Sequence, residues 1–370
     1  MTGSTTPAGT PPRILILWAA EASVNLGVAA LARGSRDLLR RAHPDAEFVY
    51  ADYGSRPREI PFGLPRSLLR ERVQGRFGMQ EYLAGFDLAW DTRSGDSFAD
   101  IYGVPRHLTM SLVHEFTVEA GTPVVMAPQT IGPFATRRGR ALARRTLRRS
   151  ALVIARDPRS AEAATELGRA PDLTAADLVF AIDPPEPGPD RDVLVNVSGL
   201  LWTENPHVDA AGYRRAIRET VQGLRAEGRE VALLAHVLES DNPDNDVPAV
   251  RALREELGED LEIIVPTDLD SVRGAIAGAN LVIASRMHAC LNALSVGVPT
   301  IPLAYSRKFA PLLGSVGWET GFDLRHDDLF SLPPRVLAAA SQVRREDAEA
   351  AAARGCASLE AVLELVRTLR

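Results

Sequence analysis

Short runs of apolar and β-branched residues recur along the chain, and each is followed by a longer stretch with apolar residues every three or four positions. The runs are typical of buried parallel strands and the longer stretches of amphipathic helices, so the alternation predicts βαβ units. The strands expected in a first series are 14–20, 48–53, 88–91, 124–127 and 152–155, with helices at 24–41, 106–119, 138–148 and 160–167. The strands expected in a second series are 193–197, 231–236, 261–265, 281–284 and 300–303, with helices at 210–227, 247–257, 269–277 and 289–296.

A proline cluster lies between the two series. The segment 183–189 holds four prolines and can continue neither a helix nor a central strand. A chain of 370 residues is also too long for one ordinary core. We therefore expect two α/β domains, over 13–185 and 190–334, each with a Rossmann-like doubly wound sheet, facing each other across a cleft. The alanine-rich segment 335–370 is expected to be helical and to pack across the lobes.

Composition narrows the class of protein. Hydrophobic residues make up 45% of the chain and charged residues 24%, which indicates a globular protein. The net charge of −6 provides no broad positive field for a nucleic acid partner. Cys290 and Cys356 have no companion at metal-ligand or redox spacing. With no signal-peptide pattern and no apolar run of membrane-spanning length, we expect a cytoplasmic protein without a transmembrane segment. Peripheral membrane contact and a homo-oligomer are both compatible with this composition.

The segment 281–317 has the strongest concentration of candidate chemistry. It predicts a buried strand, a polar junction at Ser285-Arg286-Met287-His288, a helix, a Gly-Val-Pro turn, a second strand and a second junction at 305–308. Two successive strands thus carry Arg286, His288, Arg307 and Lys308 to one edge of the sheet. Helix N-termini at that edge add N–H donors and partial positive charge, so a phosphate or carboxylate site is expected. Lys308 is the only lysine beside 41 arginines, which suggests a need for a compact ammonium there. The alternative is that these residues cap helices and face solvent.

This segment resembles the C-terminal motif of the polysaccharide pyruvyl transferases, in which Ser-Arg-(Leu/Met)-His precedes a helix, a Gly-Val-Pro turn and a Tyr-x-x-Lys element. Earlier segments are similar to further family elements in the same order. They are Pro128-Gln129-Thr130-Ile131-Gly132-Pro133, Arg156-Asp157-Pro158-Arg159-Ser160 and Asp177-Leu178-Val179-Phe180. The N-terminal matches are looser. Asn25-Leu26-Gly27 is followed by Val28 where the family often has an acid, and Ser94-Gly95-Asp96 lacks the first glycine of a Gly-Gly-Asp loop.

The resemblance implies a GT-B-like pair of lobes, phosphoenolpyruvate as donor, and a glycan precursor or glycoside as acceptor, with a pyruvate ketal and phosphate as products. No cofactor or metal is implied. His288 and Arg286 are the expected catalytic residues: His288 is titratable near neutral pH, and arginine can hold anionic oxygens bidentately. The expected substrate-binding residues are Arg156, Lys308, Arg307, Ser285, Gln129, His236, Asn25, Gly27, Asp96 and Tyr305.

Alternatives stay open at several points. The acid-rich run 239–246 is either a cation site or, as loops of Asp and Asn usually are, a solvated turn. His236, Gln129 and Tyr305 each have a structural interpretation as well as a ligand-binding one. A glycosyltransferase of the same architecture with a nucleotide-sugar donor, or a non-catalytic binding module, would also fit the two-lobed pattern. The acceptor sugar, the bridged hydroxyls, the ketal stereochemistry and the oligomeric state are outside what the sequence specifies.

Overall fold

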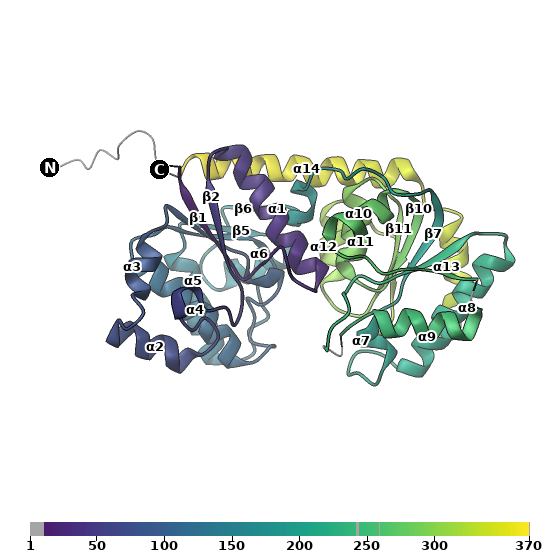
Figure 1. Ribbon diagram of the computed structural model, residues 1–370, viewed down its shortest axis with the longest axis horizontal. Helices are drawn as coiled ribbons and strands as arrows, with labels where there is room; N and C mark the ends of the chain where they lie inside the picture. Colours follow the sequence, from purple (N-terminus) through teal and green to yellow (C-terminus); the bar gives the residue numbers. More distant parts are fainter. Residues whose placement is uncertain (1–10, 242–243, 259, 370) are drawn as a thin grey trace.

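A computed structural model describes residues 11–241, 244–258 and 260–369. The chain forms two lobes side by side, each built on a six-stranded parallel sheet flanked by helices (Figure 1). The strands of the first sheet are β1 (Arg13–Leu17), β2 (Glu47–Ala51), β3 (Leu88–Asp91), β4 (Val124–Gln129), β5 (Leu152–Ala155) and β6 (Leu173–Thr174). Their order is β2-β1-β3-β4-β5-β6, so the direction of winding reverses between β1 and β3.

The second sheet has the strand order of a dinucleotide-binding domain. Its strands are β7 (Arg191–Asn196), β8 (Val231–Leu234), β9 (Glu262–Ile264), β10 (Ala279–Ala284), β11 (Thr300–Ala304) and β12 (Phe322–Asp323). The order β12-β11-β10-β7-β8-β9 places the reversal between β7 and β10. In open parallel sheets the crevice at such a reversal, beyond the carboxyl ends of the strands, is where ligands bind. The two reversals therefore indicate that a ligand would bind near the loops that follow β1, β3, β7 and β10.

Helices connect the strands and cover both faces of each sheet. In the first lobe they are α1 (Leu26–Ala42), α2 (Pro65–Gln74), α3 (Met79–Ala84), α4 (Val104–Glu119), α5 (Arg137–Arg149) and α6 (Pro158–Glu166), with short 3-10 turns η1 (Pro57–Glu59), η2 (Arg93–Gly95) and η3 (Leu178–Ala181). In the second lobe they are α7 (Gly199–Trp202), α8 (Ala210–Ala226), α9 (Val247–Leu257), α10 (Leu269–Ala277), α11 (Met287–Ser295), α12 (Phe309–Ser315) and α13 (Leu332–Ala340). Segment 183–189 connects the sheets between β6 and β7.

The expected two-lobed α/β fold is confirmed, with some elements added. All ten expected strands are present, and the additional β6 and β12 are short edge strands of two residues each. The helices α2 and α3 in segment 65–84 were not expected. The expected single C-terminal helical segment is instead two helices, α13 and α14 (Arg345–Arg367), because the chain turns between Ser341 and Arg344.

The 23-residue helix α14 lies along one side of both lobes (Figure 1). It packs against α1 and η3 of the first lobe and against α11 of the second. Its Gly355 is required by close packing, since a Cβ there would lie 2.4 Å from the Phe180 ring. One buried apolar cluster accordingly runs from β1 through η3 and α11 to α14, and joins the lobes behind the cleft.

Candidate active site

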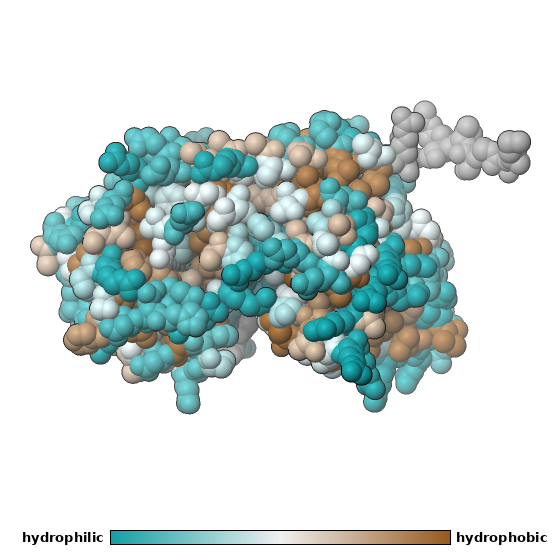
Figure 2. Space-filling view, turned by 180° about the vertical axis from the view of Figure 1, so that it is seen from behind, coloured by the Kyte–Doolittle hydropathy of each residue, from teal (hydrophilic) through white to brown (hydrophobic). Residues whose placement is uncertain are grey.

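A cleft of about 890 Å³ lies between the lobes, at the carboxyl ends of both sheets. Seen from the side opposite to Figure 1, the boundary between the lobes is rich in polar side chains and is hollowed at its lower edge (Figure 2). The residues expected from the sequence that line this cleft are Asn25, Gly27, Asp96, Arg156, His236, Arg286, His288, Tyr305, Arg307 and Lys308. Residues distant in the chain are thus brought to one cavity, as the sheet topology requires.

Gln129 and Ser285 do not line the cleft, which corrects the expectation for both. The Gln129 side chain is fully buried and donates from Nε2 to the Asp91 carbonyl at 2.9 Å. The Ser285 hydroxyl is also buried and accepts from the Tyr213 hydroxyl at 2.8 Å. Both residues lie at strand ends beside cleft-lining neighbours. Because side chains alternate between the faces of a strand, the side chains of Gln129 and Ser285 point away from the cleft.

Helices α1 and α11 begin at opposite walls of the cleft and nearly touch. The Asn25 side chain caps α1 by accepting from the Gly27 N–H at 3.0 Å. Gly27 packs against the His288 imidazole so closely that a Cβ would lie 2.6 Å from Nδ1. A glycine is therefore needed at position 27 for His288, on the first turn of α11, to reach this place. Asn25 also pairs with Val237 of the second lobe as an isolated antiparallel bridge.

His288 lies beside a buried ion pair of the first lobe. Arg156 donates from Nη1 to Asp177 at 2.7 Å and from Nε to the Thr130 hydroxyl at 2.9 Å. The His288 Nε2 is 3.8 Å from the same Asp177 carboxylate and has no hydrogen-bond partner among the described residues. Burial lowers the pKa of His288 to about 4; Asp177 opposes the shift, while Arg156 and Lys308 add to it. The imidazole is therefore neutral at pH 7 and can accept a proton.

Two cations of the second lobe reach across the cleft. The Lys308 ammonium donates to Asp96 at 2.6 Å, and Tyr102 donates to the same carboxylate at 2.8 Å. Burial alone would raise the pKa of Asp96, but Lys308, assisted by Arg156, lowers it to about 2. Arg307 donates to the Gly132 carbonyl at 2.8 Å. The chain's single lysine and its neighbour thus hold the two lobes at a set distance.

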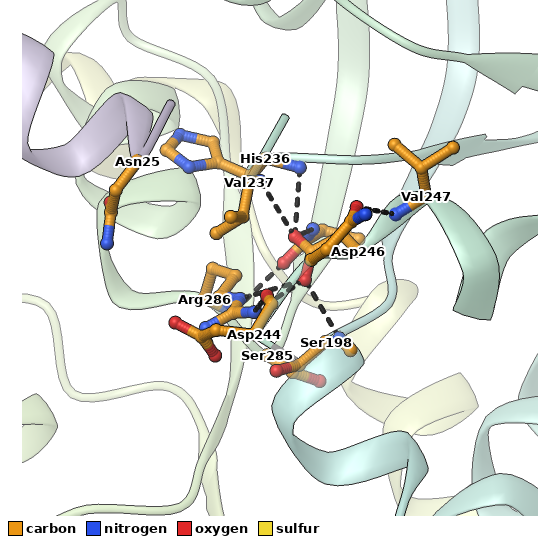
Figure 3. Close-up of polar contacts among 12 residues, drawn as sticks. Asn25, Ser198, His236, Val237, Asp244, Asp246, Val247, Ser285 and Arg286 are labelled. Carbon is orange, nitrogen blue, oxygen red and sulfur yellow. Dashed lines mark hydrogen bonds and ion pairs between the residues drawn. The ribbon is translucent and has the colours of Figure 1, made fainter. Parts of the chain in front are cut away.

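Arg286 lines the cleft and is held by two carboxylates. Its Nη1 donates to Asp244 at 2.8 Å and its Nη2 to Asp246 at 2.6 Å (Figure 3). Burial would lower the pKa of Arg286, but Asp246 and Asp244 raise it, so the side chain is permanently charged. Through these contacts Arg286 ties Asp244 and Asp246 to the start of α11.

Asp246 organises the same loop. It is fully buried and accepts from the backbone N–H groups of His236 and Val237, each at 3.0 Å (Figure 3). It also accepts from the backbone N–H of Gly199 at 2.8 Å. The acid-rich run is therefore not merely a solvated turn, because its last residue anchors the start of α9. Asn242 and Pro243 of this run lie outside the described residues. Within the described part of the chain, no group of His, Cys, Asp and Glu is arranged to hold a metal ion.

A hydrogen-bond relay fixes the state of His236. Buried Arg273, which can only donate, donates from Nη1 to Asn292 Oδ1 at 2.9 Å. The Asn292 Nδ2 must then face His236 Nε2, which lies 3.1 Å away. The relay therefore assigns a neutral His236 with its proton on Nδ1. Burial, with His288 and Arg286 nearby, lowers the pKa of His236 to about 3, which agrees with a neutral ring.

Several residues of the cleft were missed as candidates. Thr130, Tyr102, Arg106 and Arg325 line it, and Asp177 lies directly behind Arg156 and His288. Asp177 carried a usable signal, since it begins the Asp-x-x-Phe element noted in the sequence. Arg325 had no such signal, because it follows the two-residue strand β12, which the sequence pattern does not predict.

Solved structures of similar fold cover almost the whole chain. UDP-GlcNAc 2-epimerases from Methanocaldococcus jannaschii and from Neisseria meningitidis, the latter bound to UDP-GlcNAc, both superpose with a TM-score of 0.58, at 12% and 11% identity, over 96% of this chain and 99% of each enzyme. An Anabaena protein in complex with UDP and glucose superposes with a TM-score of 0.51 at 12% identity, over 96% of this chain and 98% of its own. At such identities the likeness shows the GT-B fold alone. No curated protein matches the sequence.

The sequence itself identifies the family. A family model described as polysaccharide pyruvyl transferase matches residues 25–307. The match begins at the Asn25 cap of α1 and ends at Arg307, so it contains both helix N-termini that meet in the cleft, together with Arg156, His288 and the Asp177 carboxylate. The chain belongs to the polysaccharide pyruvyl transferase family.

Proposed function

We propose that this protein transfers the pyruvyl group of phosphoenolpyruvate to two hydroxyls of one sugar, giving a cyclic pyruvate ketal and phosphate. The observation that carries the proposal is the charge of the cleft. The cationic residues that line it are Arg106, Arg156, Arg286, Arg307, Lys308 and Arg325, and the acidic ones are Asp96 and Asp244. In a chain of net charge −6, this local excess of positive charge suits a small donor that carries both a phosphate and a carboxylate.

Arg156 and Lys308 are the best placed donor ligands. They approach His288 from opposite lobes, and each is engaged by one carboxylate, so N–H groups of both remain for a ligand. The first turns of α1 and α11 add free backbone N–H groups and partial positive charge. We expect the donor phosphate and carboxylate to bind between these groups. Arg286, already paired with Asp244 and Asp246, is expected to act through the loop that it holds.

His288 fits the role of the proton carrier. One acceptor hydroxyl adds to the central carbon of the donor while the methylene carbon gains a proton, and the second hydroxyl then displaces phosphate at the same carbon. One hydroxyl proton ends on the new methyl group and the other on the phosphate, so no external proton is consumed. A neutral imidazole can accept the first proton and return it. A bound anionic donor would offset Arg156 and Lys308, the two charges that lower the pKa of His288.

The test combines ligand binding with product detection. Phosphoenolpyruvate, and not UDP-sugars, is expected to raise the melting temperature of the protein, since a ligand specific to the native state stabilises it. With a panel of glycosides, mass spectrometry is expected to find a pyruvate ketal and to lose it in His288→Gln and Arg156→Gln. The exposed Arg138→Gln on α5 is the control. Stabilisation by UDP-sugars alone would favour a glycosyltransferase and refute the proposal.

A further inference from the structure

A second cavity, of about 360 Å³, lies beside the cleft between the same two lobes. The first lobe contributes α5, α6 and the turn 130–134, and the second lobe contributes the start of α12. Thr130, Arg307 and Lys308 line both cavities, so the second cavity is adjacent to the cleft. No step proposed above for the donor or for His288 uses it.

Cationic side chains dominate this cavity. They are Arg140, Arg144, Arg159, Arg307 and Lys308, against the carboxylates of Asp157 and Glu166. The Asp157 carboxylate is already engaged, because it accepts from the backbone N–H of Ser160 at 2.9 Å and from its hydroxyl at 2.6 Å. Its negative charge is therefore directed into the N-terminus of α6 rather than at the arginines.

None of the four arginines makes an ion pair among the described residues. Arg140 and Arg307 donate to the carbonyls of Phe134 and Gly132, whereas Arg144 and Arg159 make no hydrogen bond to a described residue either. Arg144 and Arg159 are exposed at the cavity, one on α5 and one on α6. Arg145, the neighbour of Arg144 on the same helix, instead pairs with Glu115 at 2.5 Å. On α5, Arg145 is therefore neutralised by a carboxylate, whereas Arg144, which lines the cavity, is available to a ligand. Guanidinium groups placed in this way suit the oxygens of a phosphate.

Apolar side chains complete the cavity. Ile131, Phe134, Leu167 and Pro311 line it together with the arginines. A mixture of an apolar wall and cationic groups fits a sugar that carries a phosphate, because the C–H faces of the ring contact the apolar side chains while the oxyanion binds the arginines. An unsubstituted sugar would leave the guanidinium groups of Arg144 and Arg159 without an anionic partner.

We propose that this second cavity binds a phosphate or diphosphate group of the acceptor, while the acceptor's hydroxyls enter the cleft beside His288. The proposal rests on the proposed function and names the class of acceptor, a phosphorylated glycan precursor. The adjacency of the two cavities at Thr130, Arg307 and Lys308 supports it, since one molecule can contact both. The donor's own anionic groups are already matched by Arg156 and Lys308 in the cleft.

Inorganic pyrophosphate, with phosphoenolpyruvate present at saturation to occupy the donor site, is the probe for a calorimetric test. The double variant Arg144→Gln/Arg159→Gln is expected to weaken pyrophosphate binding by about tenfold or more, because each loses charge-assisted hydrogen bonds. Arg138→Gln/Arg148→Gln removes the same charge from exposed positions on α5 that line neither cavity. It is expected to leave pyrophosphate binding within about twofold of the unmodified protein.

Each outcome decides the proposal. An equal loss in both double variants, or no loss in either, would overturn it. If orthophosphate binds as tightly as pyrophosphate and the Arg144/Arg159 variant leaves the KM for a phosphorylated acceptor unchanged, the cavity receives the released phosphate, and the assignment to the acceptor is wrong. Stabilisation by phosphoenolpyruvate is measured in parallel and should be unaffected in both variants. If phosphoenolpyruvate does not stabilise the unmodified protein, the proposed function is wrong. If the unmodified protein is stabilised by phosphoenolpyruvate but does not bind pyrophosphate, only the proposal for the second cavity is wrong.

Discussion

Asn292→Asp is expected to reverse the tautomer of His236. In the present structure Arg273 occupies Asn292 Oδ1 at 2.9 Å, so the Asn292 amide donates to His236 Nε2 at 3.1 Å and leaves the imidazole proton on Nδ1. An aspartate has two acceptor oxygens and no donor. Arg273 would retain its acceptor, and His236 Nε2 would have to carry the proton. Nδ1 of the neutral ring would then lose its proton.

The distances also give the size of the pKa shift expected for His236 in Asn292→Asp. A carboxylate about 3 to 4 Å from the ring is worth about 4 kcal/mol to the imidazolium at an effective dielectric constant of 20, and the guanidinium of Arg273 cancels part of this. A net rise of about 1 to 2 pKa units is therefore expected, at 1.36 kcal/mol per unit. Starting from about 3, His236 stays neutral at pH 7.5, so the change is one of tautomer and not of charge. His236 lines the cleft, and we propose that its Nδ1–H donates to the anionic substrate. Loss of that hydrogen bond would cost about 1.5 to 3 kcal/mol, or about 10- to 100-fold in kcat/KM.

The tautomer is read directly by long-range ¹H–¹⁵N spectra of protein labelled at its histidines. There are seven histidines, and His236→Gln identifies the signals of His236 by their disappearance. The unmodified protein should show an unprotonated Nε2, and Asn292→Asp a protonated one. Gln222→Glu, an amide-to-carboxylate change at an exposed position of α8, is the matched control and should leave the pattern unchanged. A protonated Nε2 in the unmodified protein would show that Arg273 and Asn292 do not orient His236.

Three further changes have defined outcomes. Gly27→Ala puts a Cβ 2.6 Å from His288 Nδ1 and should reduce kcat by about tenfold to 100-fold through displacement of the imidazole, with the melting temperature nearly unchanged; normal turnover would contradict the close approach. Asp246→Ala leaves buried Arg286 and three backbone N–H groups without this acceptor and should cost about 3 to 5 kcal/mol in urea unfolding, whereas exposed Asp241→Ala should be neutral. The contribution of the buried histidines to the free energy of unfolding should be constant above pH 6.5. It should fall toward pH 4, by up to about 1.4 kcal/mol per pH unit for each histidine, because unfolding lets a group with a lowered pKa take up a proton. The histidines concerned are His107, His114, His236 and His288, whose pKa values are all lowered chiefly by burial. Stability that rises on acidification through this range would refute the assignment.

The strands were predictable because buried parallel strands are nearly continuous apolar runs. Strands β6 and β12 were missed because two residues form no pattern. Helices α2 and α3 were missed for a different reason. Glycines and prolines punctuate the segment around them, yet Pro65 stands at the first turn of α2 and Gly75 ends it in the left-handed conformation. The residues that usually signal loops here act as helix boundaries.

The positions of the site residues were predictable to the extent that topology determines them. His288 and Lys308 follow adjacent strands of one sheet, and parallel strands bring their carboxyl ends to one edge. Gln129 and Ser285 obey the same rule, but the direction of a side chain at a strand end depends on local backbone geometry that spacing does not encode. The hydrogen-bond partners were less predictable still. Asp246 is 40 residues from Arg286 in the sequence, and nothing in either segment indicates the other.

The partners change the interpretation of each cation. Arg286 has two carboxylates, one of them fully buried, while Arg156 and Lys308 have one each. Removing Arg286 from its acids to bind a substrate would leave a buried charge uncompensated, which is costly. Lys308 and Asp96 are both partly exposed to the cleft, so the ammonium can add a ligand oxygen without leaving its carboxylate. Anionic ligands should therefore depend on Lys308 and Arg156 for contact, and on Arg286 for the positions of His236, Val237 and Asp244, which line the cleft.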